Sequence, residues 1–241
     1  MSKSRILLYL LLGCSTVFSF SCKKEDVNSD GLRMVKGVPY YHFTDSDKPW
    51  LSAQEGDIWK LENASGYQRI YKLWVIEQLQ AKNQKFGSPG IPSAAPKLLN
   101  YYDSRVMRIN RLDSALGAGE IRFYRDASLL SALNSGGSDK HKSQFYAEGE
   151  WYDFVGNTNL ISDYFSCQGM KFPSGANLEG PFTQLTVRGR QYNEVVVFTA
   201  TDRGATCKAV PSRFMQEMYY DRRAGIIKMV SKAGEVWERV P

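Results

Sequence analysis

The stretch Phe214–Val240, FMQEMYYDRRAGIIKMVSKAGEVWERV, carries the clearest fold signal in this chain. Its apolar and aromatic segments are short, and polar runs containing glycine separate them. One such run lies between Tyr220 and Ile226, and Lys232–Glu235 is the second. Because residues of this kind favour a tight reversal of the chain, we expect three antiparallel strands joined in sequence, which is a β-meander.

Strand signals of the same kind recur upstream of this stretch. Asp57–Glu62 and Leu185–Arg188 alternate polar and apolar residues, and Val195–Phe198 is a short apolar run typical of a buried strand. Strands are also expected at Val106–Leu112 and Glu120–Tyr124. The sequence therefore predicts a mainly β protein, either an antiparallel sandwich or a partly open barrel, with few short helices.

Turns, loops and the few helices can be placed by composition. Helix signals are weak, and Leu73–Ala81 and Ala127–Leu133 are the two segments where we expect a helix. The expected turns and loops are Asn63–Gly66, Arg188–Arg190, Tyr192–Asn193, Phe86–Pro96 and Ser135–Lys140.

A small pattern of glycine, acid and tryptophan occurs three times, at Glu55–Trp59, Glu148–Trp151 and Ala233–Trp237. Glycine supplies the backbone freedom for a tight turn, and the tryptophan then begins a strand that buries it. We interpret the pattern as a repeated hairpin device. Coincidence is the alternative, because the middle copy is one residue shorter.

The first residues of the chain predict export. Lys3 and Arg5 precede the apolar run Ile6–Leu12, which is shorter than the roughly 20 apolar residues that span a bilayer. A charged start, a short apolar core and a small residue at the cut site form the secretory pattern. Cys22 follows Ser21 where the apolar segment ends, so we expect cleavage before Cys22 and lipidation of its thiol. Cys14 fits the usual lipobox better and is the alternative.

At this point the chain resembles outer-membrane lipoproteins of the Bacteroidota type. The resemblance rests on Cys22 and on the charged run Lys23–Asp26 directly after it. It implies a lipid anchor in the outer membrane and export to the cell surface. We therefore divide the chain into a signal peptide (1–21), a flexible tether (22–36) and a single β-rich domain (37–241). An ordinary secretory signal without a lipid is the alternative.

The composition fits a folded domain and argues against nucleic acid as a partner. Hydrophobic residues make up 43% of the chain and charged residues 23%, as in ordinary globular proteins. The formal net charge is +6, from 31 basic and 25 acidic residues, and removal of Lys3 and Arg5 leaves +4. The basic residues are scattered along the sequence, whereas nucleic-acid binding needs a clustered basic stripe.

The cysteines and histidines indicate a disulfide and no metal site. Cys167 and Cys207 remain in the mature domain, and in an oxidising compartment a disulfide between them is the simplest interpretation. Its loop of about 40 residues would be stabilised by roughly 3–4 kcal/mol. Two unrelated buried thiols are the alternative. His42 and His141 are the only histidines, so we expect neither a zinc site nor a cofactor.

The densest acidic group beside aromatic residues is Glu148, Glu150 and Asp153, next to Trp151 and Tyr152. Residues two apart on a strand share a face at about 6.6–6.8 Å, between the two carboxylate spacings of glycoside hydrolases. An acid/base pair is one interpretation. A solvated turn at Gly149 is the other, and we favour it, with no residue assigned as catalytic.

Adjacent aromatic residues give a further hint of binding. They are Tyr40–Tyr41, Tyr101–Tyr102, Trp151–Tyr152 and Tyr219–Tyr220. Neighbours on a strand point to opposite faces, so one of each pair should enter the core. An outward partner can stack on a sugar ring or contact a protein, although a two-layer β fold also needs many aromatic residues inside.

We therefore expect a non-catalytic lipoprotein, anchored in a membrane, that binds a glycan or a protein ligand. Glu148, Glu150, Trp151 and Tyr152 are the candidate contact residues. A lipocalin-like carrier of an apolar ligand is the first alternative, and a glycan-acting enzyme that uses Glu148 or Glu150 is the second.

Overall fold

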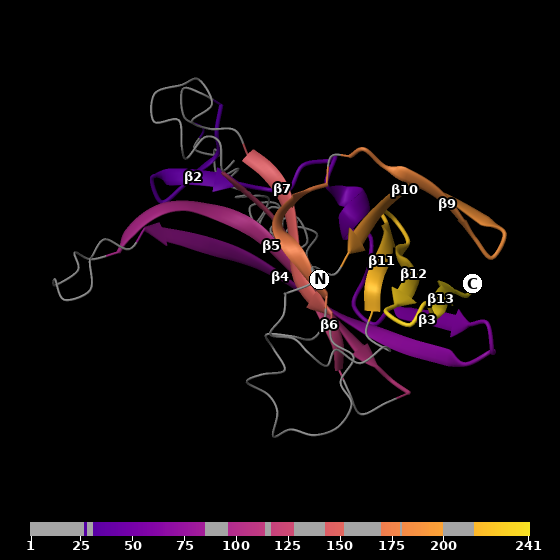
Figure 1. Cartoon of the computed structure of the whole chain (residues 1–241). Helices are drawn as coiled ribbons and strands as arrows, with labels where there is room; N and C mark the ends of the chain where they lie inside the picture. Colours follow the sequence, from indigo (N-terminus) through magenta and orange to yellow (C-terminus); the bar gives the residue numbers. More distant parts are fainter. Residues whose placement is uncertain are drawn as a thin grey trace, which may run out of the picture.

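The computed structural model describes Val27 and residues 31–84, 96–113, 117–127, 143–151, 170–178, 180–199 and 215–241. In these residues thirteen strands form a single mixed sheet (Figure 1). The described residues also contain one 3-10 turn, η1 (Lys48–Leu51), and no α-helix. The strands are β1 (Met34–Val35), β2 (Val38–Tyr41), β3 (Ile58–Asn63), β4 (Gln68–Gln84), β5 (Lys97–Arg111), β6 (Gly117–Ala127), β7 (Ser143–Trp151), β8 (Met170–Asn177), β9 (Thr183–Val187), β10 (Arg190–Thr199), β11 (Met215–Asp221), β12 (Gly225–Ser231) and β13 (Val236–Arg239).

The sheet is two antiparallel meanders joined side by side. Its order is β8-β7-β6-β5-β4-β3-β13-β12-β11-β10-β9, so strands β3 to β8 and strands β9 to β13 each follow the chain. The junction is the antiparallel pair β3–β13, in which Trp237 lies opposite Asn63. A hairpin of β1 and β2 adds the one parallel contact, with Tyr40 opposite Tyr101 on β5.

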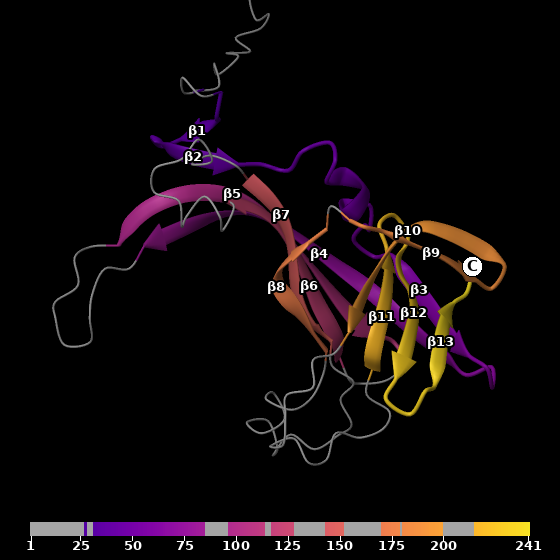
Figure 2. The same cartoon turned by 45° about the horizontal axis from the view of Figure 1, so that its top comes forward.

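The sheet curls on itself without closing. Figure 2 shows β9–β13 turned toward the long strands β4–β7, and β8 approaches β10 and β11 without joining them in the hydrogen-bonded order. The strands β8 and β9 at the two ends of that order are not paired with each other in the described residues. The mainly β fold predicted from the sequence is therefore confirmed, in the form of one open, curled sheet.

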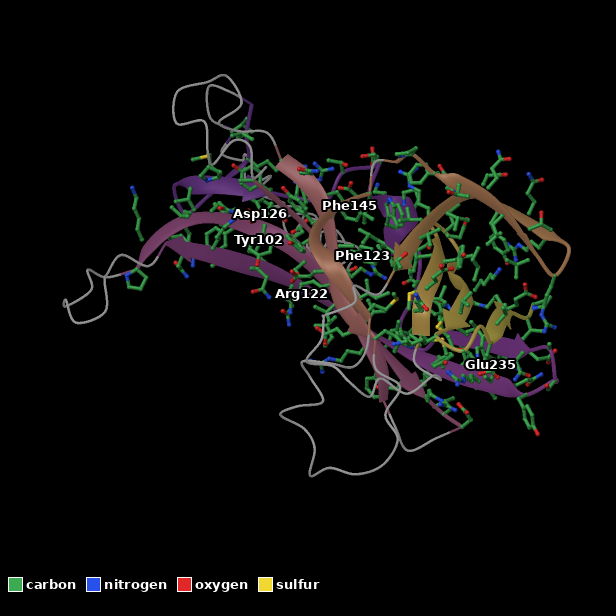
Figure 3. All side chains as sticks on the ribbon, viewed as in Figure 1. Tyr102, Arg122, Phe123, Asp126, Phe145 and Glu235 are labelled. Carbon is green, nitrogen blue, oxygen red and sulfur yellow. The ribbon has the colours of Figure 1, made fainter. Side chains whose placement is uncertain are left out.

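The core lies between the two meanders, with Trp50 of η1 at its centre. The Trp50 ring lies 5.9 Å from the ring of Tyr220 on β11 and 6.3 Å from that of Phe123 on β6. Phe123 stacks on Phe145 of β7 at 5.8 Å, and both lie near the middle of the molecule in Figure 3. Because aromatic rings bury large apolar areas, these contacts hold the halves together.

The helix predicted at Leu73–Ala81 is wrong, because the whole segment belongs to β4. Its residues pair with β5 in register from Tyr71↔Arg111 to Lys82↔Asn100. The side chains alternate along the strand, with Leu73 fully buried and Trp74 51% exposed. Long-range pairing overrides the weak helical propensity of this segment. In the second predicted helix, Ala127 ends β6 and residues 128–133 lie outside the described residues.

The predicted C-terminal meander is confirmed as β11, β12 and β13. The turn at Arg188–Arg190 is also confirmed, since Arg188 and Gly189 have φ of 48° and 78°, as a two-residue hairpin turn of this twist requires. The turn predicted at Tyr192–Asn193 is wrong, because both residues belong to β10, at a bulge opposite β9. The turn at Asn63–Gly66 is present, with the Gly66 amide donating to the Asn63 carbonyl at 3.0 Å.

The glycine–acid–tryptophan pattern is a turn in two of its three copies. Gly56 and Gly234 have φ of 86° and 82°, and each precedes a strand with a buried tryptophan, Trp59 or Trp237. Gly149 instead lies inside β7, opposite Ile121 of β6. The solvated turn predicted there is therefore wrong.

The remaining predictions about the chain ends and loops are tested only in part. Met34 and Val35, within the predicted tether, form β1 and pair with β2. The signal segment, Cys14, Cys22, Cys167 and Cys207 lie outside the described residues, as do Ser135–Lys140 and most of Phe86–Pro96. No helix within the described ranges is long and apolar enough to span a membrane.

Candidate functional site

Among the acidic candidates, Glu148 lies on the outer face of β7, away from the core. Glu148 faces Arg122 of β6 in register, and their side chains form an ion pair at 3.3 Å. Arg122 also lies 3.8 Å from Glu120, so the Glu148 carboxylate belongs to a surface network of alternating charge. Glu150 lies opposite Glu120 on the same strand pair, and its side chain is outside the described part.

The aromatic candidates do not join this acidic group. Trp151 is 1% exposed and packs edge-on against Tyr71 at 5.4 Å, on the opposite face of β7 from Glu148. Tyr152 and Asp153 lie outside the described residues. Glu148 and Trp151 therefore lie on opposite faces of β7 and do not form a shared binding surface.

The adjacent aromatic pairs divide between two faces where both members are described. Tyr220 is 2% exposed in the core, whereas Tyr219 packs on the other face of β11 beside Val195 and Ile227. On β5, the Tyr102 ring lies 6.0 Å from the Tyr124 ring, and the two rings are tilted by 60°. Burial raises the pKa of Tyr102, and the nearby Asp126 carboxylate raises it further; Figure 3 shows the two residues close together.

A cleft with a different chemistry opens at the junction of the two meanders. It has a volume of about 390 Å³ and lies between β3, the β9–β10 turn, the β11–β12 turn and the end of β13, and Pro241 also lines it. Five cationic side chains and one acidic side chain line it, and we call it the cationic cleft: Lys60, Arg188, Arg190, Arg223, Arg239 and Asp57.

Arg239 forms the floor of the cationic cleft. Its guanidinium lies over the Trp59 ring at 5.1 Å, and Nη1 donates to the carbonyl oxygens of Ile226 at 3.2 Å and Ala224 at 3.4 Å. Burial lowers the pKa of Arg239 to about 10, and the neighbouring charge of Arg190 lowers it as well, whereas Asp57 raises it. Arg239 is therefore a desolvated cation that stays charged at neutral pH.

Arg190 begins β10 and forms one wall of the cleft. Its guanidinium lies 5.1 Å from the ring centre of Tyr192, two residues along the same strand face. Within the described part of the chain, neither Arg190 nor Arg239 nor the exposed Lys60 has a carboxylate at ion-pair distance. Three cations of the cleft are therefore without a neutralising partner there.

Two other cations of the cleft are paired with carboxylates. Arg188 pairs with Glu62 at 2.9 Å, and Arg223 lies 3.7 Å from Glu194. The Asp57 carboxylate accepts a hydrogen bond from the neutral Gln54 amide at 2.8 Å, so its negative charge remains and acts on Arg239. One acidic side chain against Lys60, Arg190 and Arg239 leaves the cleft with an excess of positive charge, and an anion is the complementary ligand.

The cations of this site are far apart in the chain, and the sequence predicts only a turn at Arg188–Arg190. The β3–β13 pair places Arg239 opposite Leu61, next to Lys60. Ion pairs from Arg188 to Glu62 and Glu238 join the β9–β10 turn to these two strands. Elsewhere in the described ranges, no group of three or more His, Cys, Asp or Glu residues is arranged to hold a metal ion.

Comparison with protein families, with curated proteins and with solved structures found no match for this chain.

Proposed function

We propose that this chain is a lipid-anchored protein of the bacterial cell envelope whose β domain binds a ligand without catalysing a reaction. The anchor is the acylated Cys22, which follows the apolar export segment and precedes the charged run Lys23–Asp26. A single saturated chain binds a membrane marginally, whereas several acyl chains on one cysteine hold firmly. The outer membrane, with the domain facing outward, is the proposed location.

The observation that carries the binding function is the cationic cleft. It is concave, its volume of about 390 Å³ lies in the range of small-molecule sites, and Arg190, Arg239 and Lys60 supply donors that no carboxylate of the described chain neutralises. Binding needs only such complementary groups. A reaction would in addition need an acid, base or nucleophile placed at the ligand.

A lipocalin-like carrier is less well supported. That function needs an internal cavity for an apolar ligand, lined by the inward aromatic residues. Tyr220, the inward member of its pair, instead packs among the rings of Trp50, Trp59 and Phe198 at 5.9–6.5 Å. Side chains occupy the region where the carrier's ligand would lie.

A glycan-acting enzyme is supported less still. A glycoside hydrolase needs two carboxylates that face each other across the scissile bond. Glu148 lies on the outer face of β7 and is paired with Arg122 at 3.3 Å.

Intact mass and protease accessibility on whole cells test the proposal. The natural chain should carry a diacyl or triacyl modification at Cys22, and external protease should remove the domain from the cells. Cys22→Ala should abolish the modification and release the protein from the membrane. Cys14→Ala is the matched control, because it changes the other candidate cysteine, and it should leave mass and location unchanged.

Two results would contradict the proposal. If Cys22→Ala leaves the mass and the location unchanged, the lipid anchor is wrong and the chain is an unlipidated exported protein. If Cys14→Ala has the effect expected of Cys22→Ala, the lipid is at Cys14 and the charged run no longer follows the anchor directly.

A further inference from the structure

We propose that the cationic cleft binds a phosphate or sulfate ester on a compact ligand, with Arg190 and Arg239 holding the oxyanion and Lys60 adding a third positive charge. This inference rests on the proposed ligand-binding function and names the chemistry of the ligand. Four observations support it: the fixed orientation of the two guanidinium groups, their free donor atoms, the uncompensated charge and the size of the cleft.

Both guanidinium groups are held by aromatic rings before any ligand arrives. Arg239 lies over Trp59 and Arg190 over Tyr192, each with 5.1 Å from the guanidinium carbon to the ring centre. Trp59 and Tyr192 are themselves 3% and 7% exposed, so the rings are fixed by the core. A side chain ordered in advance loses less conformational entropy on binding.

The donor atoms of Arg239 are divided between the protein and the cleft. Both hydrogen bonds that the structure gives to this side chain come from Nη1, to the carbonyl oxygens of Ala224 and Ile226. Nε and Nη2 remain for an acceptor. These two atoms form the side of the guanidinium fork that binds two oxygens of one phosphate or sulfate group.

The charge of the cleft favours a phosphate ester over a single carboxylate, whereas a sulfate ester has a single charge like a carboxylate and differs from it by presenting three terminal oxygens. Arg190 and Arg239 repel each other, as the effect of Arg190 on the pKa of Arg239 indicates. Lys60 adds a third cation to the same cleft. A phosphate monoester carries about −1.5 to −2 at pH 7, so one group can neutralise two of the three cations at once.

The size of the cleft favours a compact ligand. A volume of about 390 Å³ is near the lower end of small-molecule sites, which run from roughly 300 to 1,000 Å³. That space holds the ester together with a small body such as one sugar ring.

Calorimetric titration of the full chain in detergent tests the inference. The probes are glucose 6-phosphate, glucose 6-sulfate and neutral glucose. Both esters should bind and glucose should not, and binding should weaken as sodium chloride is raised, because salt screens exposed charges. Vesicles of phosphatidylcholine containing phosphatidate distinguish a lipid phosphate from a soluble one. Only a lipid-specific site would bind these vesicles more tightly than glucose 6-phosphate.

Variants of the exposed cations Arg190 and Lys60 assign the site without disturbing the core. Arg190→Gln should weaken the binding of glucose 6-phosphate by about tenfold, the usual effect of losing one hydrogen bond between charged groups, and Lys60→Gln should weaken it less. Arg239→Lys keeps the charge but removes the fork, and should also weaken binding. Arg108→Gln is the matched control, because it removes one exposed positive charge from β5, outside the cleft.

The inference is overturned if neither ester binds, or if Arg190→Gln and Lys60→Gln bind them as Arg108→Gln does. Should neutral glucose or a glutamate-rich peptide bind instead, and lose affinity in Arg190→Gln, the ester is wrong while ligand binding in the cleft stands. The lipid anchor is tested separately, through the mass at Cys22, so failure of one proposal does not imply failure of the other.

Discussion

Gly225 rests directly against the indole of Trp59: a β-carbon at Gly225 would lie 2.3 Å from Cζ2 of that ring. Gly225 begins β12 with φ of 79°, a backbone conformation that favours glycine. Arg239 stacks on the same indole at 5.1 Å. The absence of a side chain at position 225 therefore lets the strand approach the ring that supports the floor of the cationic cleft.

Gly225→Ala should destabilise the domain by about 2–4 kcal/mol, the sum of overpacking against Trp59 and a left-handed backbone at a residue with a β-carbon. Urea unfolding followed by tryptophan fluorescence measures the free energy of unfolding. Gly189→Ala is the matched control, because its φ is 78° and nothing lies within 4 Å of the added carbon. It should cost about 1 kcal/mol. Equal losses in the two variants would show that the contact with Trp59 is unimportant.

The ion pair between Arg125 and Asp47 ties η1 to β6 inside the protein. Nε of Arg125 lies 2.7 Å from Oδ2 of Asp47 and Nη2 lies 2.9 Å from Oδ1, and the side chains are 10% and 3% exposed. Arg125→Gln should cost about 3–5 kcal/mol, because it leaves a buried carboxylate without its partner. Thermal and urea unfolding provide the measurement.

The control for this pair is Arg108→Gln. Arg108 pairs with Glu120 at 3.1 Å on the surface, and its side chain is 58% exposed. Exposed pairs contribute about 0–1 kcal/mol. If Arg125→Gln costs no more than Arg108→Gln, the Arg125–Asp47 pair contributes little to the attachment of η1.

The titration of Tyr219 should depend on Glu217. The Tyr219 hydroxyl donates to the Glu217 carboxylate at 2.6 Å, and this hydrogen bond, with burial, raises the pKa of Tyr219 to about 12. Since the folded-state pKa is above the ordinary value of 10.0, the stability that the pair contributes is complete below pH 10. It is lost as the pH rises from 10 to 12.

Glu217→Gln should therefore lower the pKa of Tyr219 toward 10, because an amide exerts no charge on the phenolate. The chemical shift of a labelled tyrosine ring carbon, followed by NMR against pH, measures this pKa. Glu235→Gln is a suitable control, because Glu235 bonds Asn63 at 2.8 Å on another pair of strands. A pKa that stays near 12 in Glu217→Gln would assign the shift to burial alone.

The predicted disulfide joins Cys167 and Cys207, which both lie outside the described residues. Intact mass before and after reduction should differ by the two hydrogens of one disulfide, and alkylation should label these cysteines only after reduction. Cys167→Ser and Cys207→Ser should each lower the free energy of unfolding by roughly 3–4 kcal/mol. Free thiols in the oxidised protein would instead support the interpretation of two unrelated cysteines.

Local sequence patterns predicted the elements whose contacts are close in the chain. The meander β11–β13 and the Arg188–Gly189 turn follow from short apolar runs and from residues that accept a positive φ. The sequence predicts a helix at Leu73–Ala81, whereas hydrogen bonding to β5, outside this segment, holds it as a strand. Gly149 was mistaken for a turn because pairing with β6 keeps it extended.

The sequence by itself determined the β-rich class and the meander, because both depend on neighbouring residues and their spacing, and it predicts the lipid anchor at Cys22 on the same basis. Only the tertiary structure decided that the sheet stays open and that Lys60, Arg190 and Arg239 line one cleft. These residues come from three strands, and their proximity depends on the pairing of β13 with β3 and on the curl of the sheet. The spacing of residues along the chain does not predict such contacts, because they depend on packing between distant segments.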